Sequence, residues 1–193
     1  MKTAFAALKF LTFAGRFERN QVNLQQVSAA IPYFPLVGIF LGFVLVLLNR
    51  LLDPRLESEI LGALLIGVLA LLTGGIHYQG LQNTFDALSV KLGHGEETGG
   101  SHAFGVLAIV FVVLLKVRAV EVTGETRSLG LLLTPVFARW SLVIFLYGSA
   151  SAAEGTARTF AAGVRAWHLI LTTVITLALA TFLVGRTALW IGL

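Results

Sequence analysis

The stretch YFPLVGIFLGFVLVLL, from Tyr33 to Leu48, decides the fold, because it carries no charged side chain over its whole length. Asn49 and Arg50 follow it directly and end the apolar run. A helix that spans the hydrocarbon core of a bilayer needs about 20 predominantly apolar residues. The run approaches that length and therefore predicts a membrane-spanning helix.

Four further apolar runs follow along the chain: Ile60–Ile76, Ala103–Leu115, Leu129–Gly148 and Leu169–Val184. The run from Ala103 is short, so we expect it either to be re-entrant or to be extended by its flanks. The last run is expected to break at Gly185 and Arg186. Together the runs predict an all-α fold, a polytopic integral membrane helical bundle of about four to six mostly transmembrane helices. We expect one transmembrane domain over residues 1–193.

The composition supports a bilayer environment. The chain has 193 residues, of which 56% are hydrophobic and 12% charged, whereas soluble domains carry about 25% charged residues. The formal net charge is +4, but the basic residues are scattered and do not alternate with aromatic residues, so nucleic-acid binding is not supported. The chain has no cysteine, which excludes disulfides, zinc–thiolate sites and cysteine nucleophiles.

The N-terminal segment 1–20 is basic, with Lys2, Lys9, Arg16 and Arg19. Lys9 interrupts its apolar part, so we interpret the segment as a retained amphipathic or interfacial helix rather than a signal peptide. Its positive charge favours a cytoplasmic N-terminus. The polar segments 77–102 and 151–166 are then expected on the cytoplasmic side of a multi-pass protein of the inner (cytoplasmic) membrane.

Segment 77–102 is the longest polar stretch between the apolar runs, and one interpretation is a flexible solvated loop. Another is a binding site, because Gln79, Asn83 and Asp86 would share one face of a helix. The alternative for these three side chains is contact with interfacial water only. Three nearby glycines would let backbone or a ligand approach closely: Gly74, Gly75 and Gly80.

Three further residues are candidates because of where they lie relative to the apolar runs. Arg139 lies inside one, and a charge at that depth indicates either a functional group, such as a ligand for a substrate phosphate, or an internal pair. Lys116 ends another run and is interpreted as a side chain that extends to the membrane interface. His77 is a candidate acid–base or ligand-orienting group, with a structural hydrogen bond as the alternative.

The stretch GGIHYQGLQNTFDAL, from Gly74 to Leu88, resembles the motif G-G-x-H-x-D-G-L-x-D-T-x-D of the cobalamin synthases, the adenosylcobinamide-GDP ribazoletransferases. Seven positions match it in register: Gly74, Gly75, His77, Gly80, Leu81, Thr84 and Asp86. Three other stretches resemble family elements in the same order: YFPLVGIFLG (33–42), FGVLAIVFVVLLK (104–116) and LTPVFARW (133–140). The resemblance covers nearly the whole chain.

The resemblance implies a membrane enzyme that joins α-ribazole, or its phosphate, to adenosylcobinamide-GDP and releases GMP. It implies His77 and Asp86 as catalytic residues, Asp86 as a ligand of Mg²⁺, and both substrates as binding partners. Phosphoryl transfer needs positioning and charge neutralisation, and Mg²⁺ prefers hard oxygen ligands. The substrate-binding residues implied are Gly74, Gly75, Gly80, Gln79, Asn83, Thr84 and Arg139.

The chain departs from the family pattern in three places. Gln79 and Asn83 stand where the motif has acids, which should weaken Mg²⁺ binding severely. In the stretch that corresponds to D-S-R-x-G-x-x-G, Thr98 and Gly100 replace the aspartate and the arginine, and Gly105 is retained. His102 is a weak substitute for that arginine. The chain also ends before the family's G-G-x-T-G-D element.

These departures predict a degenerate or C-terminally truncated member with impaired activity. The alternative is a non-catalytic membrane homologue that binds a corrinoid intermediate or a protein of the same pathway. Further copies of the chain and corrinoid-pathway proteins are the candidate protein partners.

Overall fold

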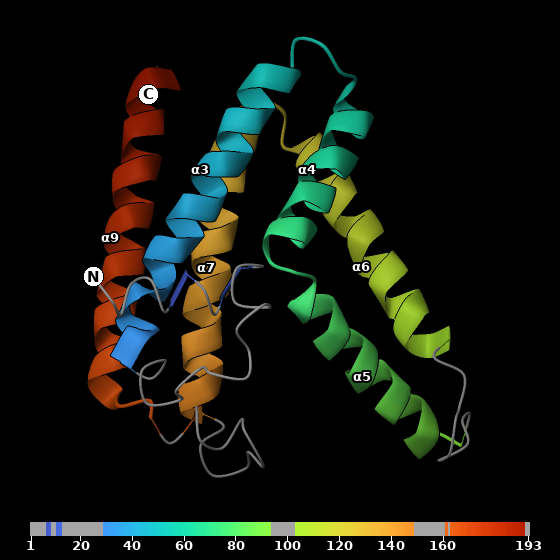
Figure 1. The fold of residues 1–193 in the computed structure, drawn as a ribbon. Coiled ribbons are helices and arrows are strands. Elements are labelled where there is room, and N and C mark those ends of the chain that lie inside the picture. The colour runs from blue at the N-terminus through green and yellow to red at the C-terminus, as the bar shows by residue number, and fades with distance from the viewer. Residues whose placement is uncertain are drawn as a thin grey trace.

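The computed structural model describes residues 7–8, 11–12, 29–93, 103–148, 161 and 163–191, with side chains up to Gly185. Within these ranges the structure is helical and contains no strand, which confirms the all-α prediction (Figure 1). The elements are η2 (Ile31–Tyr33), α3 (Phe34–Leu52), α4 (Ser58–Leu72), α5 (Ile76–Lys91), α6 (Ala103–Val122), η3 (Gly124–Thr126), α7 (Arg127–Gly148) and α9 (Ala166–Ile191).

Four segments of the described chain are long and apolar enough to cross a membrane: Ile31–Leu52, Ala103–Val122, Gly124–Gly148 and Ala166–Gly185. A fifth span results if α4 and α5, which meet at 91°, form one broken span. The short apolar run that begins at Ala103 is extended by its C-terminal flank to form α6. This confirms one of the two expectations for it, extension rather than a re-entrant segment. The last apolar span of the described residues ends at Gly185, but the helix α9 itself continues past Arg186 to Ile191. A single glycine inside a helix costs only about 1 kcal/mol.

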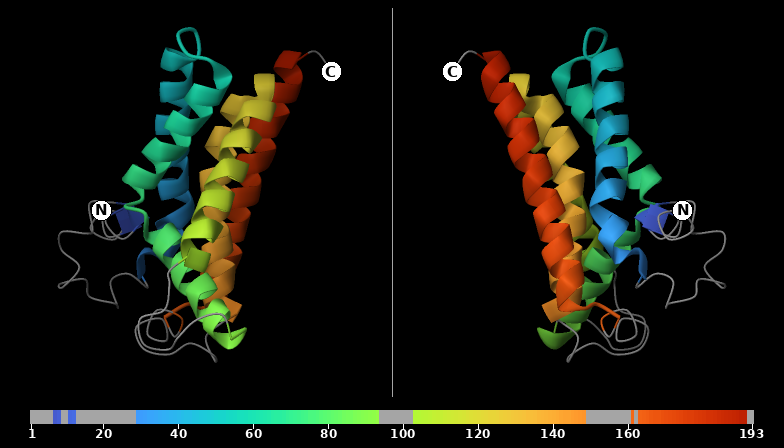
Figure 2. Two further views of the ribbon diagram at one scale, coloured as in Figure 1. Left: turned by 90° about the vertical axis from the view of Figure 1, so that its right-hand side faces the viewer. Right: turned by 90° about the vertical axis from the view of Figure 1, so that its left-hand side faces the viewer.

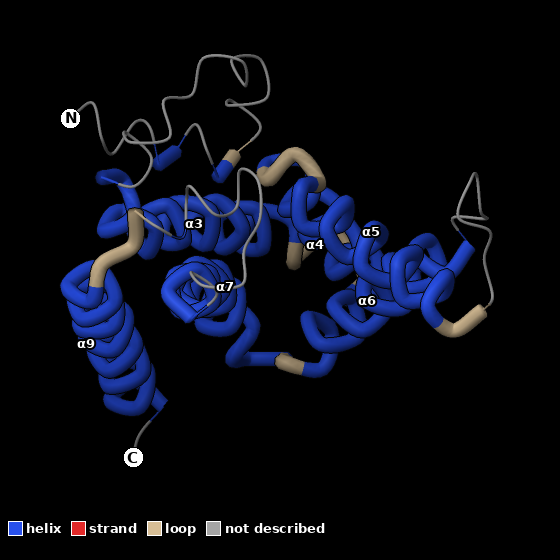
Figure 3. Tube along the Cα trace, turned by 90° about the horizontal axis from the view of Figure 1, so that it is seen from below, coloured by secondary structure: helices blue, strands red, loops and turns tan. Residues whose placement is uncertain are grey.

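The helices form two groups, which the view along the bundle separates clearly (Figure 3). In the first group α7 packs between α3 and α9, and in the second α6 packs on both α4 and α5. Contact between α3 and α4 joins the groups, whereas α6 and α7 touch only slightly. A space therefore remains between α4 and α6 on one side and α7 on the other, and the side chains that line it are described below.

The tight contact between α3 and α7 depends on two glycines four residues apart. A Cβ at Gly38 would lie 2.6 Å from Val136 Cα, and one at Gly42 would lie 2.6 Å from the Leu132 carbonyl oxygen. Small residues at this spacing let the backbones of membrane helices approach closely. The element F-P-L-V-G-x-x-x-G thus has a structural reason, because it allows α3 to hold α7 in place.

The sharp turn between α4 and α5 is built by Gly74 and Gly75, with φ of 65° and 67°. The N–H of Gly75 donates to the carbonyl of Ala70 and that of Gly74 to the carbonyl of Leu71, both bonds that a Schellman motif requires. Left-handed backbone favours glycine because it has no Cβ. The pair Gly74–Gly75 therefore ends α4 and directs α5 away from it at a steep angle.

Arg127 ties three elements together at the other end of α7. Its Nη1 lies 2.8 Å from Asp53 Oδ1, its Nε donates to the Val120 carbonyl at 3.1 Å, and its Nη2 donates to Ser58 Oγ. Asp53 follows α3, Ser58 begins α4 and Val120 belongs to the last turns of α6. The buried guanidinium therefore fixes how α7 begins relative to the other three helices.

The first part of the predicted polar loop 77–102 is helical, since α5 occupies Ile76–Lys91. Residues 94–102, including His102, Thr98 and Gly100, lie outside the described residues, as does most of segment 1–20. Ala7 and Leu11 of that segment are described, and both are buried in a cluster with residues of α3. The described ends that flank 94–102 and 149–160 lie at one end of the bundle, as expected for segments on the same side of a membrane (Figures 1 and 2).

Candidate functional site

A cavity of about 500 Å³ lies in the space between α4, α6 and α7, and Leu45 of α3 contributes to its wall. The residues of α7 that line the cavity lie three or four positions apart from Arg127 to Phe145, so one whole face of that helix borders the cavity. Most of the lining is apolar, and no Asp or Glu of the described residues belongs to it. The polar lining comes from Thr73, His77, Tyr78, Lys116, Thr123, Arg127, Thr134, Arg139 and Ser141.

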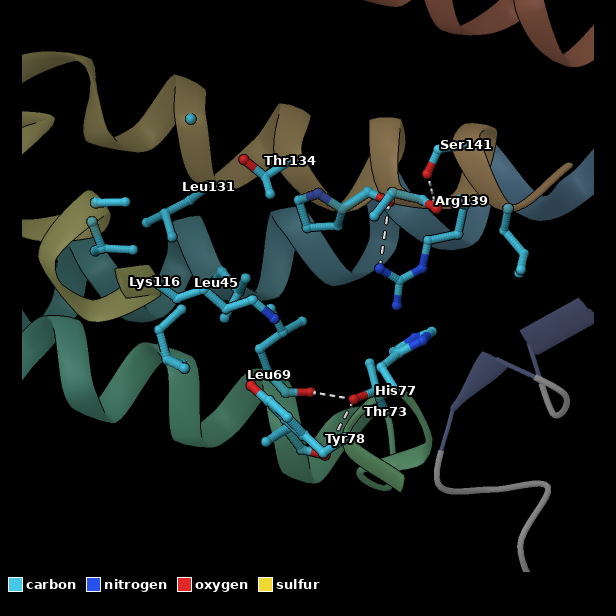
Figure 4. A pocket seen from close by; sticks show the side chains of 18 of the residues that line it. Leu45, Leu69, Thr73, His77, Tyr78, Lys116, Leu131, Thr134, Arg139 and Ser141 are labelled. Carbon is cyan, nitrogen blue, oxygen red and sulfur yellow. Dashed lines mark hydrogen bonds between the residues drawn. The ribbon is translucent and has the colours of Figure 1, made fainter. Parts of the chain in front are cut away.

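Arg139 is the most unusual residue of this lining. Its side chain is buried, with 4% of the residue exposed, and its guanidinium points into the cavity toward His77 (Figure 4). Nη1 has a long contact of 3.5 Å with the Pro135 carbonyl, whereas Nε and Nη2 have no hydrogen-bond partner among the described residues. A buried cation without partners costs several kcal/mol. An anion bound in the cavity would supply hydrogen-bond acceptors for Nε and Nη2 of this guanidinium.

Lys116 adds to the positive character of this part of the cavity, and His77 lines the same part. Lys116 extends from α6, and its Nζ lies 5.0 Å from the centre of the Tyr78 ring, a cation–π contact. His77 and Tyr78 both belong to the first turn of α5. Arg139 interacts electrostatically with both Lys116 and His77. Three helices thus place a guanidinium, an ammonium and an imidazole around one volume, an arrangement suited to a phosphate group.

Of the residues expected at the site, the cavity brings His77 and Arg139 together. Gly74 and Gly75 form the turn that places His77, but they do not line the cavity. Gly80, Gln79, Asn83 and Thr84 are exposed on α5 away from it, and Thr84 Oγ1 donates to the Gly80 carbonyl at 2.8 Å. The steep turn after α4 explains the separation, because only the first turn of α5 reaches the cavity.

Asp86 lies between α5 and α6 rather than at the cavity. Its Oδ1 accepts a hydrogen bond of 2.8 Å from the backbone N–H of Gly105. Gly105 belongs to the first turn of α6, where backbone N–H groups have no partner within the helix. A Cβ at Gly105 would lie 2.7 Å from this same Oδ1 and 2.5 Å from Gln82 Cγ. The glycine retained at this position therefore allows α6 to begin against Asp86.

The described residues contain no group of three or more His, Cys, Asp or Glu side chains placed to hold a metal ion. Asp86 is already a hydrogen-bond acceptor, and Gln79 and Asn83 offer only neutral amide oxygens. Magnesium prefers one or two carboxylates together with substrate phosphates and water. Its binding stays a prediction, to which the undescribed Glu96 and Glu97 are relevant.

Sequence reasoning did not assign Lys116 and Tyr78 to the site. Lys116 was interpreted as an interfacial side chain because it follows an apolar run, yet α6 continues beyond it to Val122. A lysine inside a spanning helix is itself a signal of function, and the correct helix length would have revealed it. Nothing in the sequence around Tyr78 predicts a role for it, because its contact is with Lys116 of another helix.

The sequence profile of the cobalamin-5-phosphate synthases (CobS) matches residues 3–193. The chain belongs to the cobalamin-5-phosphate synthase family. It is a family of enzymes of cobalamin synthesis, so the transferase class and the membrane bundle predicted from the motifs are confirmed.

Three relatives, each named adenosylcobinamide-GDP ribazoletransferase, show how far the similarity extends. The protein of Geotalea daltonii is 28% identical over 96% of this chain and 77% of its own length. The protein of Alkaliphilus metalliredigens is 31% identical over 93% and 74%, and that of Syntrophobacter fumaroxidans 32% identical over 92% and 75%. The chain thus spans about three quarters of these relatives. No solved structure matches it significantly.

Proposed function

We propose that this chain is a membrane transferase that joins α-ribazole, or its phosphate, to adenosylcobinamide-GDP. A ribose hydroxyl oxygen bonds to the phosphorus that carries the cobinamide, and the P–O bond to GMP breaks. GMP leaves with the bridging oxygen, and the hydroxyl proton is released. Such reactions depend mainly on positioning and on neutralising the phosphate charge. No step of this proposal depends on magnesium.

The observation that carries the proposal is the buried guanidinium of Arg139, which points into the cavity without acceptors for Nε and Nη2. A substrate phosphate there would supply those acceptors, and Arg binds phosphate in a planar, two-pronged geometry. Lys116 would neutralise further charge once it leaves the Tyr78 ring. His77, on the opposite wall, would accept the proton of the attacking hydroxyl or orient a phosphate oxygen.

The test is product formation by the purified chain in proteoliposomes with adenosylcobinamide-GDP and α-ribazole or α-ribazole 5′-phosphate. Mass spectrometry should detect both a complete corrinoid and an equal amount of GMP. Arg139→Gln should lower the rate with α-ribazole 5′-phosphate by about tenfold to a hundredfold, since a hydrogen bond to a charged group contributes about 1.5–3 kcal/mol. Arg118→Gln is the matched control, because Arg118 is an exposed arginine paired with Glu121 on the same bundle. Equal rates for both variants would refute the role of Arg139.

A second candidate function is a non-catalytic homologue that binds a corrinoid intermediate or a pathway protein. It is favoured by the exposed amides Gln79 and Asn83 at motif positions that carry acids in the family. In that case the purified chain would bind adenosylcobinamide-GDP but release no GMP. The same assay therefore separates the two candidates.

We further propose that the cavity is used from the cytoplasmic face of the inner membrane. This is supported by the basic N-terminal segment and by the shared end of the bundle at which α5 ends and α6 begins. We also propose that the chain associates with other copies of itself or with proteins of the corrinoid pathway.

A further inference from the structure

The cavity is much longer than its cationic part. Arg139 and Arg127 both line it, and they are 12 positions apart on α7, which corresponds to about 18 Å along a helix. Arg127 is already paired with Asp53 and bonded to Val120 and Ser58, so its charge is satisfied within the protein. The rest of the lining is mostly apolar and includes Leu45, Ile66, Leu69, Ala119, Val120 and Leu131, with Thr123 and Thr134 among its polar residues.

This combination of linings fits an amphipathic ligand. An apolar chamber favours a flat apolar ring, because burial removes ring surface from water. The cation at one end favours a phosphate or another anion. No acidic side chain among the described lining residues would repel that anion. A ligand with an uncharged aromatic base at one end and a sugar phosphate at the other therefore matches both parts of the cavity.

The size of the cavity decides between the two substrates. Cavities of about 300–1,000 Å³ hold ligands of drug size, and the present one is about 500 Å³. A nucleoside phosphate with a bicyclic base is of drug size. A corrin ring that carries an adenosyl group and a GDP is several times larger, so its ring has to remain outside the chamber.

We infer that the chamber between Arg139 and Arg127 is the binding site of the smaller substrate, the ribazole nucleotide, with its base against the apolar walls and its phosphate at Arg139. This inference rests on the proposed function for the identity of the nucleotide. The corrinoid then presents its diphosphate near His77, which lines the cavity. The chamber walls thereby determine which base the enzyme accepts.

Gly130 offers a way to fill the chamber without touching the cationic residues. It lines the cavity on α7, and a Cβ there would meet only Thr123 Cγ2 at 4.0 Å, so a larger side chain has room to enter. Gly67 is the matched control, because it is exposed on α4, does not line the cavity and has nothing within 4 Å of its added Cβ. Gly130→Leu and Gly67→Leu thus make the same chemical change in and outside the chamber.

The experiment measures equilibrium binding of α-ribazole 5′-phosphate and of adenosylcobinamide-GDP to both variants and to the unmodified protein in nanodiscs. Gly130→Leu should raise the dissociation constant of α-ribazole 5′-phosphate about tenfold or more and leave that of adenosylcobinamide-GDP unchanged. Gly67→Leu should change neither. Retained corrinoid binding shows that the Gly130 variant is folded, and Ala119→Phe on α6 provides a second filling variant.

The inference is overturned if Gly130→Leu and Ala119→Phe bind the nucleotide as well as the unmodified protein does. It is also overturned if they weaken the corrinoid as much as the nucleotide, which would place the larger substrate in the chamber. A protein that binds the nucleotide in this selective way but releases no GMP would refute the proposed transferase activity and support the binding site. If Gly130→Leu and Ala119→Phe release GMP at the same nucleotide concentrations as the unmodified protein, the binding site is refuted and the transferase activity is not.

Discussion

The carboxylate of Asp86 holds the beginning of α6, because its Oδ1 accepts the N–H of Gly105 at 2.8 Å. A carboxylate at a helix N-terminus satisfies a backbone donor and interacts favourably with the helix dipole. The two residues are 19 positions apart and belong to different motif elements. Their contact gives both elements a structural role that does not require a metal.

Asp86→Ala should therefore lower the free energy of unfolding by about 1 kcal/mol, the usual effect of losing a helix cap. Asp86→Asn should retain most of the stability, because an amide oxygen still accepts the Gly105 N–H. Thermal unfolding in detergent micelles measures both. If the two variants are equally stable and differ only in Mg²⁺ binding, Asp86 acts as a metal ligand instead.

The lost acids of the motif lead to a separate expectation. Gln79→Asp with Asn83→Asp adds two charges on the exposed face of α5, and the affinity for Mg²⁺ measured by titration calorimetry should rise. Thr84→Asp with Ala87→Asp, also exposed on α5, is the control for added charge alone. An equal rise in both double variants would show that general electrostatic attraction, rather than a shaped site, binds the ion.

Close packing between α3 and α7 predicts a strong effect of one added methyl group. Gly38→Ala would bring a Cβ to 2.6 Å from Val136 Cα, so the helices have to separate. Overpacking of this kind costs about 1–3 kcal/mol, and the unfolding temperature in detergent should fall. Gly67→Ala, where the structure leaves open space, should be neutral or slightly stabilising. Equal unfolding temperatures would contradict the close approach.

The orientation in the membrane can be tested by labelling single cysteines, since the native chain has none. Lys91 is exposed at the end of α5, and Arg55 is exposed in the connection between α3 and α4. This connection lies at the opposite end of the bundle from the end of α5 (Figure 1). An impermeant maleimide should label Arg55→Cys in intact spheroplasts and Lys91→Cys only after lysis. Ser89 is unsuitable because it is buried, with 3% exposed. Labelling of Lys91→Cys in intact spheroplasts would reverse the proposed topology.

The sequence predicted the helical bundle well. In a chain with so little charge, long apolar runs such as Tyr33–Leu48 indicate a bilayer, where a helix satisfies all backbone hydrogen bonds within one segment. It did not predict the turn at Gly74 and Gly75, because the apolar run Ile60–Ile76 passes through both glycines, whereas α4 ends at Leu72 and both glycines have left-handed backbone. The continuation of α9 past Gly185 could not be predicted from the residue alone. Whether one glycine ends a helix depends on what surrounds it.

The site was predicted only in part, for a geometric reason. Gln79, Asn83 and Asp86 were expected to form its polar face from their spacing on a helix. The direction of that face depends on the 91° turn and on the packing of α5 against α6, neither of which the spacing encodes. Arg139 was recognisable because a charge is costly inside an apolar run, and His77 because it matches the motif. Lys116 and Tyr78 become related only in three dimensions.

The most direct measurement is the affinity of α-ribazole 5′-phosphate and of adenosylcobinamide-GDP for Arg139→Gln and Arg139→Lys in nanodiscs, with Arg118→Gln as the control. Hydrogen bonds to a charged group contribute about 1.5–3 kcal/mol. Arg139→Gln should therefore weaken at least one phosphate-bearing substrate by about tenfold to a hundredfold, and Arg139→Lys should weaken it less. Unchanged affinity for both substrates in a folded Arg139→Gln protein would contradict the claim that this buried guanidinium binds a substrate phosphate.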